Sequence, residues 1–290
     1  MKKLLILLAL AGTFIFVYFT WMSKSVPPAS SASKIKSSKL REISGLVFSE
    51  QNEGLMWMHN DSGRGKRFYL VDKSGVTRAV FTWDEDLKDW EDIALGPGPV
   101  KGKPYIYAGD IGDNTAVRPD ITIYRFPEPK ISDEKHVTKV EKIIYKYPDR
   151  SRDAEAMFID PLTEQLYIIS KREANVRIYK ASTHYRDGDT AILERVGKLH
   201  IEGLKMLGWV TAADISRDGE KILVRTYGNV FYWKRRPDQT VEEALKAQPQ
   251  KLTHVGELQG EAIGFTPDGK GYYTVREGKN PYLNYNRIKK

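Results

Sequence analysis

The strongest constraint on the fold is a short apolar segment that recurs along the chain after residue 41. Each copy is rich in Val, Ile, Phe, Met or Ala, and several copies end in a turn such as SRDG or TPDG. Such runs, bounded by Gly, Asp, Asn and Pro, are typical of β-strands and turns. The copies are Glu42–Ser49, Trp90–Pro97, Ala154–Pro161, Thr211–Gly219 and Gly260–Gly269.

Each copy is followed by further strand-like segments in the same order. The second segments are Leu55–Asp61, Tyr105–Asp110, Leu166–Glu173, Ile222–Gly228 and Gly271–Glu277, and the third are Arg67–Asp72, Ile121–Pro127, Val176–Ser182, Val230–Arg235 and Tyr282–Ile288. Fourth strands fit at VTRAVFTW, VEKIIYKYP, LERVGKLHI and KLTHVGEL. Four antiparallel strands repeated at roughly 47 to 64 residues predict an all-β protein, a β-propeller of five blades. Two packed sheets are the competing architecture, but they give no reason for this period.

The last unit ends after its third strand, so its outer strand must come from elsewhere. We expect the segment Lys34–Leu40 to supply that strand and close the ring, because closure removes exposed sheet edges. Residues 34–290 are then a single propeller domain. One helix is predicted at Thr240–Ala247, where Thr240 and Glu243 have capping-box spacing.

The N-terminus has the pattern of a membrane anchor or a signal sequence. Lys2 and Lys3 precede an uncharged apolar run, Leu4–Met22, which is about long enough to cross a bilayer. Residues 1–23 are therefore predicted to be a transmembrane anchor or signal, and residues 24–33 a linker. The positive-inside rule places the following domain outside the cytoplasm. We expect a single-pass protein of the cell membrane, or a secreted protein if the segment is cleaved.

Composition excludes several classes of site. The chain has no Cys, which rules out disulfides, thiolate metal sites and a Cys nucleophile. The formal net charge of +8 favours anionic neighbours, and it is equally compatible with a soluble basic surface. Neither an arginine-rich arm nor a helix-turn-helix pattern is present, so nucleic-acid binding is not indicated.

Oxygen-bearing residues recur at one level of the first strands. The first strand of each blade lines the central channel of a propeller, so equivalent residues converge on one axis. Aligned on their apolar residues, the strands place Ser44, Glu91, Glu155 and Glu261 together, and Thr211 is the nearest donor in the fourth blade if an offset is allowed. Carboxylates on one axis repel one another unless protons or a cation neutralise them, and hard oxygen donors suit calcium. The alternative is that each Glu pairs with a neighbouring Arg or caps backbone amides in its own blade.

A second set of polar residues follows the second strands, at the expected mouth of the channel. Basic side chains there either form structural salt bridges or hold a small anionic or polyhydroxylated ligand. The predicted mouth residues are Asn60, Asp110, Lys171, Arg225 and Arg276.

Two functions are compatible with these residues. The first is a non-catalytic binding or scaffold module with a calcium-like ion in its channel. The second is a metal-dependent hydrolase of phosphoesters or phosphoanhydrides. In the hydrolase, Arg225 and Arg276 would hold the developing charge and Asp110 would act as the base. The chain has no GxSxG elbow, Walker loop, HExxH motif or dinucleotide fingerprint.

Several short motifs resemble those of known families. The strings DWEDIA, GDIGDN, IYRFPEP, EAM and QGEAI resemble an uncharacterised group of exported bacterial β-propeller proteins, over most of the region from Arg41 to Glu277. That resemblance implies the fold and an exported location. The Ser and Glu positions of the first strands are also similar to the layout of the calcium-activated nucleotidases, or soluble apyrases. Those enzymes are five-bladed propellers with calcium in the tunnel, so this likeness implies a calcium ion at Ser44, Glu91, Glu155 and Glu261.

Overall fold

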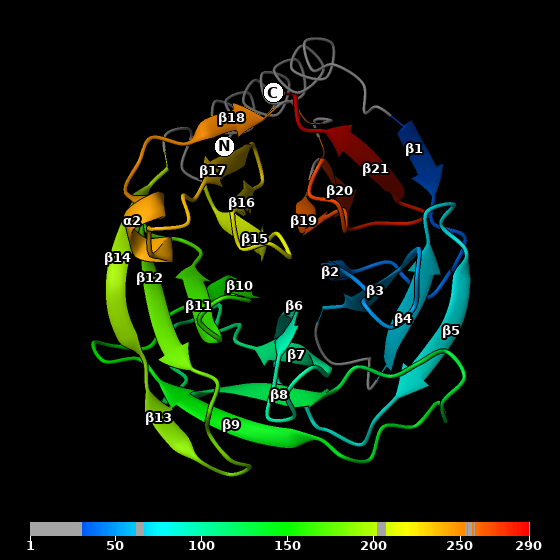
Figure 1. Ribbon diagram of the computed structural model, residues 1–290, viewed down its shortest axis with the longest axis horizontal. Helices are drawn as coiled ribbons and strands as arrows, with labels where there is room; N and C mark the ends of the chain where they lie inside the picture. Colours follow the sequence, from blue (N-terminus) through cyan, green and yellow to red (C-terminus); the bar gives the residue numbers. More distant parts are fainter. Residues whose placement is uncertain are drawn as a thin grey trace, which may run out of the picture.

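A computed structural model describes residues 31–61, 67–201, 207–252, 254, 257 and 259–289. Five β-sheets stand around a common centre like the blades of a propeller (Figure 1). Each sheet contains four antiparallel strands, so the predicted all-β, five-bladed architecture is confirmed. Two packed sheets are excluded.

The blades follow the chain in order. Blade 1 contains β2 (Ile43–Phe48), β3 (Leu55–Asn60), β4 (Arg67–Asp72) and β5 (Thr77–Thr82), and blade 2 contains β6 (Trp90–Pro97), β7 (Pro104–Asp110), β8 (Ile121–Pro127) and β9 (Glu141–Lys146). Blade 3 contains β10 (Ala154–Ile159), β11 (Gln165–Ser170), β12 (Asn175–Ser182) and β14 (Glu194–His200). Blade 4 contains β15 (Val210–Ile215), β16 (Lys221–Thr226), β17 (Val230–Lys234) and β18 (Gln250–Leu252), and blade 5 contains β19 (Gly260–Phe265), β20 (Gly271–Arg276), β21 (Tyr282–Arg287) and β1 (Ser31–Lys34).

The first strands of the blades form the inner ring. Each of β2, β6, β10, β15 and β19 contacts the equivalent strands of both neighbouring blades, and Figure 1 shows them nearest the centre. Apolar side chains fill the spaces between blades in five clusters, one for each pair of neighbours. Blades 1 and 2, for example, enclose Trp57, Phe68, Trp83 and Phe126. Burial between sheets is therefore what fixes the ring.

An N-terminal strand closes the ring as predicted, but it lies earlier in the chain than we expected. Strand β1 pairs with β21 of blade 5 and falls mostly within the segment predicted as a linker. The expected strand, residues 34–40, instead crosses the space between blades 5 and 1. Its apolar residues Ile35 and Leu40 are fully buried there, which is incompatible with an exposed outer strand.

Two further elements lie outside the four-strand pattern of the blades. Strand β13 (Thr190–Ile192) runs parallel to β9 and extends the outer edge of blade 2. The predicted helix is present as α2 (Val241–Leu245), between β17 and β18. The Thr240 hydroxyl accepts from the Glu243 amide and the Glu243 carboxylate accepts from the Thr240 amide, so the capping box is confirmed.

The predicted membrane anchor, residues 1–23, lies outside the described residues. Within the described residues, no helix is both long and apolar enough to cross a bilayer.

Candidate metal centre

A β-bulge near the start of every inner strand gives the five blades an equivalent axial position. In each blade the pairing between the first two strands skips one residue: Ser44, Glu91, Glu155, Thr211 and Glu261. A bulge bends the strand and re-aims a side chain, which is why bulges often stand beside functional sites. The alignment of the four predicted ligands is thus reproduced, and Thr211 takes the fifth position without any offset.

The two hydroxyl members of this set connect neighbouring blades. Ser44 Oγ donates to the main-chain oxygen of Glu91 over 2.5 Å, and Thr211 Oγ1 donates to the main-chain oxygen of Gly260 over 2.8 Å. Ser44 Oγ also lies 3.4 Å from Glu91 Oε2. Both hydroxyls therefore fix the spacing of the ring, and Ser44 contacts the candidate site at its edge.

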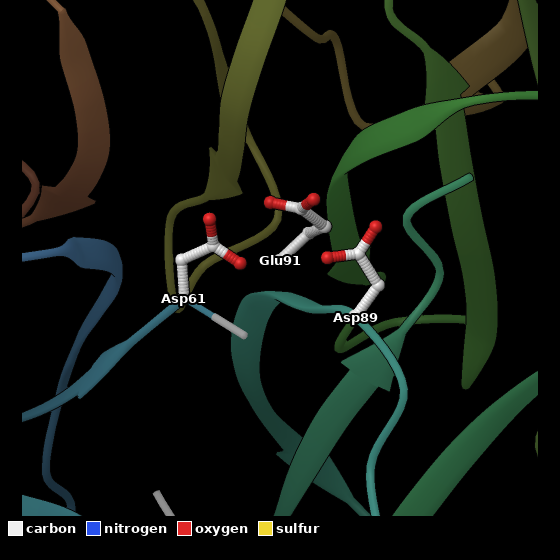
Figure 2. Close-up of side chains that lie close together, drawn as sticks. All are labelled: Asp61, Asp89 and Glu91. Atoms are coloured by element: carbon white, nitrogen blue, oxygen red, sulfur yellow. The ribbon is translucent and has the colours of Figure 1, made fainter. Parts of the chain in front are cut away.

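The carboxylates that come together most closely are those of Asp61, Asp89 and Glu91. Their nearest oxygens all lie within 4.8 Å of one another, and Figure 2 shows the three groups turned toward a common space. Asp61 follows β3 of blade 1, whereas Asp89 and Glu91 stand at the start of β6 in blade 2. The group thus bridges two blades. Asp61 and Asp89 were not among the predicted metal ligands.

The absence of a side chain at Gly112 makes room for this cluster. A Cβ atom added to Gly112 would lie 2.5 Å from Asp89 Oδ2 and 2.5 Å from Glu91 Oε1. Any larger residue would push both carboxylates away from their present positions. Gly112, the second glycine of the GDIGDN motif, therefore allows the two carboxylates to take these positions.

Asp110 holds Asp89 in place. Its two carboxylate oxygens accept the main-chain amides of Lys88 and Asp89 over 3.1 and 2.9 Å, and Arg118 donates to it over 2.8 Å. The Gly112 amide adds a bond to the main-chain oxygen of Asp89 over 3.2 Å. Asp110 is buried. The DWEDIA motif thus supplies two of the three carboxylates, and the GDIGDN motif fixes the main chain of Asp89.

The cluster is electrostatically unfavourable without a cation. Burial, followed by repulsion from Asp61 and Asp153, raises the pKa of Asp89 to about 6. Burial, then repulsion from Glu155, Asp61 and Asp89, raises the pKa of Glu91 well above its usual range. Among the residues that the structure describes, neither Asp89 nor Glu91 has an ion-pair partner. A bound cation would offset both the burial of these negative charges and the repulsion between them.

The other two predicted glutamates have partners of their own. Lys171 forms a buried ion pair with Glu155, and the Tyr227 hydroxyl donates to Glu261. Burial, countered in part by Lys171, Tyr227 and Arg225, raises the pKa of Glu261. The predicted set of four ligands is therefore divided, and the cluster of three carboxylates includes only Glu91 from it.

The remaining predicted mouth residues lie in different surroundings. Arg225 is buried between blades 4 and 5, where it donates to Glu257 over 2.5 Å and to the main-chain oxygen of Ala262 over 2.8 Å. Asn60 accepts from the amides of Arg41 and Glu42 and so fixes the chain before β2.

Arg276 ends β20 at the mouth and donates to the main-chain oxygen of Glu277 over 3.3 Å. Of the two arginines, Arg276 is partly exposed and Arg225 is buried.

The opposite end of the channel contains a small cavity. A cavity of about 60 Å³ opens there, lined by residues from all five inner strands or the turns that follow them. Its lining is mixed: apolar side chains such as Val47, Leu95 and Phe265 stand beside the charged residues Asp214 and Arg217. The cluster of Asp61, Asp89 and Glu91 lies at the other end of the channel, where the inner strands begin.

Sequence alone offered a signal for Asp61, one of the two missed acids. Asp61 is the first residue after the last paired position of β3, and its equivalents in the other blades are Ile111, Lys171, Tyr227 and Glu277. This second five-fold set lies beside the first. Aligning the second strands as strictly as the first ones would have singled out Asp61.

Comparisons with known proteins add little to these observations. No protein-family model matches the chain, and no curated protein matches it. The chain is similar to a crystal structure of a nidogen/laminin complex, with 13% identity and a TM-score of 0.44, over 82% of this chain and 73% of that one. A likeness of this extent adds nothing to the fold, which follows from the sheet topology. Both family resemblances stay predictions.

Proposed function

We propose that this protein is an extracytoplasmic binding or scaffold propeller that holds a calcium-like divalent cation at the mouth of its channel. The observation that carries the proposal is the convergence of Asp61, Asp89 and Glu91 from two blades to within 4.8 Å. Calcium accepts six to eight oxygen ligands, so three carboxylates leave positions open for water or a ligand. The apolar N-terminal run supports a location at the membrane surface, with the propeller outside the cytoplasm.

A small anionic or polyhydroxylated ligand would bind through the ion in this proposal. The mouth itself is rich in carboxylates, and repulsion from Glu261 and Asp61 adds to burial in raising the pKa of Glu277 to about 7. An anion approaching this surface would be repelled unless a cation lay between them. Arg276, at the end of β20, is the predicted basic residue that is placed to assist.

Hydrolysis is the second hypothesis, and the geometry favours it less. Two of its three predicted catalytic residues are engaged in holding the fold: Arg225 pairs with Glu257, and Asp110 binds two amides and Arg118. An arginine held between blades is not positioned to stabilise charge on a phosphoryl group. We therefore expect no phosphate release from nucleoside diphosphates or phosphate monoesters in the presence of calcium.

The test of cation binding is a comparison of metal content and thermal stability. The full-length chain, purified in detergent, should retain a divalent metal that a chelator removes. Added calcium should then raise the melting temperature, since a ligand at a hundred times its Kd stabilises by about 2.7 kcal/mol. That gain corresponds to roughly 2–4 °C for each kcal/mol in a domain of this size. An unchanged melting temperature in millimolar calcium would contradict the proposal.

A further inference from the structure

Lys171 stands at a position where two other blades present acids. It is the first residue after the last paired position of β11, the place that Asp61 takes in blade 1 and Glu277 takes in blade 5. Its side chain is 5% exposed. Blade 3 thus places a positive group at the mouth of the channel where two other blades place negative ones.

The surroundings of this ammonium group form a cation site. Nζ is bonded to Glu155 and lies over the ring of Trp209 at 5.8 Å and over that of Tyr227 at 5.4 Å. Aromatic faces attract cations, most strongly where water is excluded. The Tyr227 hydroxyl also donates to Glu261, which connects the second carboxylate to the same group.

The charge on Lys171 is maintained by the carboxylates around it. Burial alone would lower its pKa, but attraction to Glu155, Glu261 and Glu91 outweighs burial and raises the pKa of Lys171. In the same way, Lys171 offsets part of the upward pKa shift that burial and Glu261 cause in Glu155. The ammonium therefore neutralises the part of the axial ring that lies outside the cluster of Asp61, Asp89 and Glu91.

We infer that Lys171 is a tethered cation that occupies a second axial cation position, between Glu155 and Glu261, so that the native propeller binds one divalent ion instead of two. The inference rests on the proposed function, because it concerns the number of ions that the same ring accepts. If Lys171 loses its charge, Glu155 and Glu261 become two buried carboxylates without a cation, as Asp89 and Glu91 are.

The stoichiometry of calcium binding tests this inference. Isothermal titration of the full-length chain in detergent should give one calcium ion for the wild type and two for Lys171→Gln. Lys171→Arg keeps the positive charge and should still bind one. Terbium provides a second readout: excitation through Trp209 should give stronger terbium luminescence in Lys171→Gln than in either of the other two chains.

The outcomes separate this inference from the proposed function. One ion in both the wild type and Lys171→Gln would overturn the inference and leave the proposed site intact. No ion in the wild type and one in Lys171→Gln would contradict the proposed site and support the role of Lys171.

Folding of the variant can be controlled with a double substitution. Glu155→Gln combined with Lys171→Gln removes the ion pair together, so no buried charge is left alone, and this chain should fold and bind one ion. If Lys171→Gln stays unfolded in millimolar calcium while the double variant folds, a cation does not replace the ammonium and the inference is wrong.

Discussion

Glu91 and Glu155 occupy the same bulge position in neighbouring blades, yet within the described part of the chain only Glu155 is paired with a cationic side chain. Substitution of these two residues should therefore change the stability of the metal-free protein in opposite directions. Glu91→Gln removes a buried, repelled carboxylate and should raise the free energy of unfolding, because burial and its acidic neighbours disfavour the charged form of Glu91 in the folded chain. Glu155→Gln leaves Lys171 buried without its partner and should lower the free energy of unfolding by about 3–5 kcal/mol.

Denaturant melts in metal-free buffer check this contrast, and calcium titrations complete it. Glu91→Gln should lose calcium binding as it gains stability, whereas a residue needed only for packing would lose stability on substitution. Equal destabilisation by both substitutions would show that Glu91 is satisfied within the fold and has no need of a cation.

Gly112 should be sensitive to the addition of a single methyl group. A Cβ there would lie 2.5 Å from the carboxylate oxygens of Asp89 and Glu91, so Gly112→Ala must displace both. We expect the calcium affinity to fall at least tenfold, or about 1.4 kcal/mol, measured by isothermal titration. Gly197→Ala is the matched control, because its Cβ would meet nothing closer than 3.3 Å. An unchanged affinity in Gly112→Ala would place the ion elsewhere.

His59 should make stability depend on pH. It is fully buried, its ring stacks on Trp90 with centroids 4.0 Å apart, and burial lowers its pKa to about 3. In the unfolded chain the pKa returns to about 6.5, so below that pH only the unfolded state takes up the proton. The stabilisation that neutral His59 provides is complete above pH 6.5 and declines by about 1.4 kcal/mol per pH unit as the pH falls toward 3.

The variant His59→Gln isolates this contribution because it does not titrate. The difference in unfolding free energy between wild type and variant, measured in denaturant at several values from pH 7 to pH 4, should shift in favour of the variant as the pH falls. A difference that stays constant over this range would mean that His59 takes up its proton in the folded state.

Strand β1 should contribute measurably to stability although its side chains are largely exposed. It pairs with β21 at four positions, from Ser31 opposite Tyr285 to Lys34 opposite Tyr282. At about 1 kcal/mol for each net hydrogen bond, a chain that begins at residue 35 should be less stable by about 2–3 kcal/mol than one that begins at residue 24. Alanine at positions 31 and 33 should leave the melting temperature unchanged, because the pairing uses the main chain. Equal melting of the two truncated chains would contradict the closure.

Most of the fold followed from the period of the apolar segments. Five copies of an inner strand, each followed by three further strands, are typical of a five-bladed propeller. The apolar residues of these strands are buried between blades. The closing strand was placed too late because its sequence, SASK, has no apolar alternation. Its pairing depends on the main chain alone, whereas the more strand-like Ile35 and Leu40 are core residues.

The candidate site was predicted only in outline. Alignment of the inner strands found the bulge positions, but it could not show which carboxylates have cationic partners. That depends on the adjacent position after the second strand, where blade 3 has Lys171 and blade 1 has Asp61. The part played by Asp89 depends on Asp110 and Gly112, which fix its main chain from another strand. Such three-dimensional contacts leave no periodic signal.

A crystal structure of the protein grown in calcium tests the central claim most directly. We predict an ion bound by oxygens of Asp61, Asp89 and Glu91 at about 2.3–2.6 Å, the usual calcium–oxygen distance, with Lys171 still paired to Glu155. A structure in saturating calcium that shows the three carboxylates without an ion, or an ion held by Glu155 and Glu261 in their place, would contradict the account.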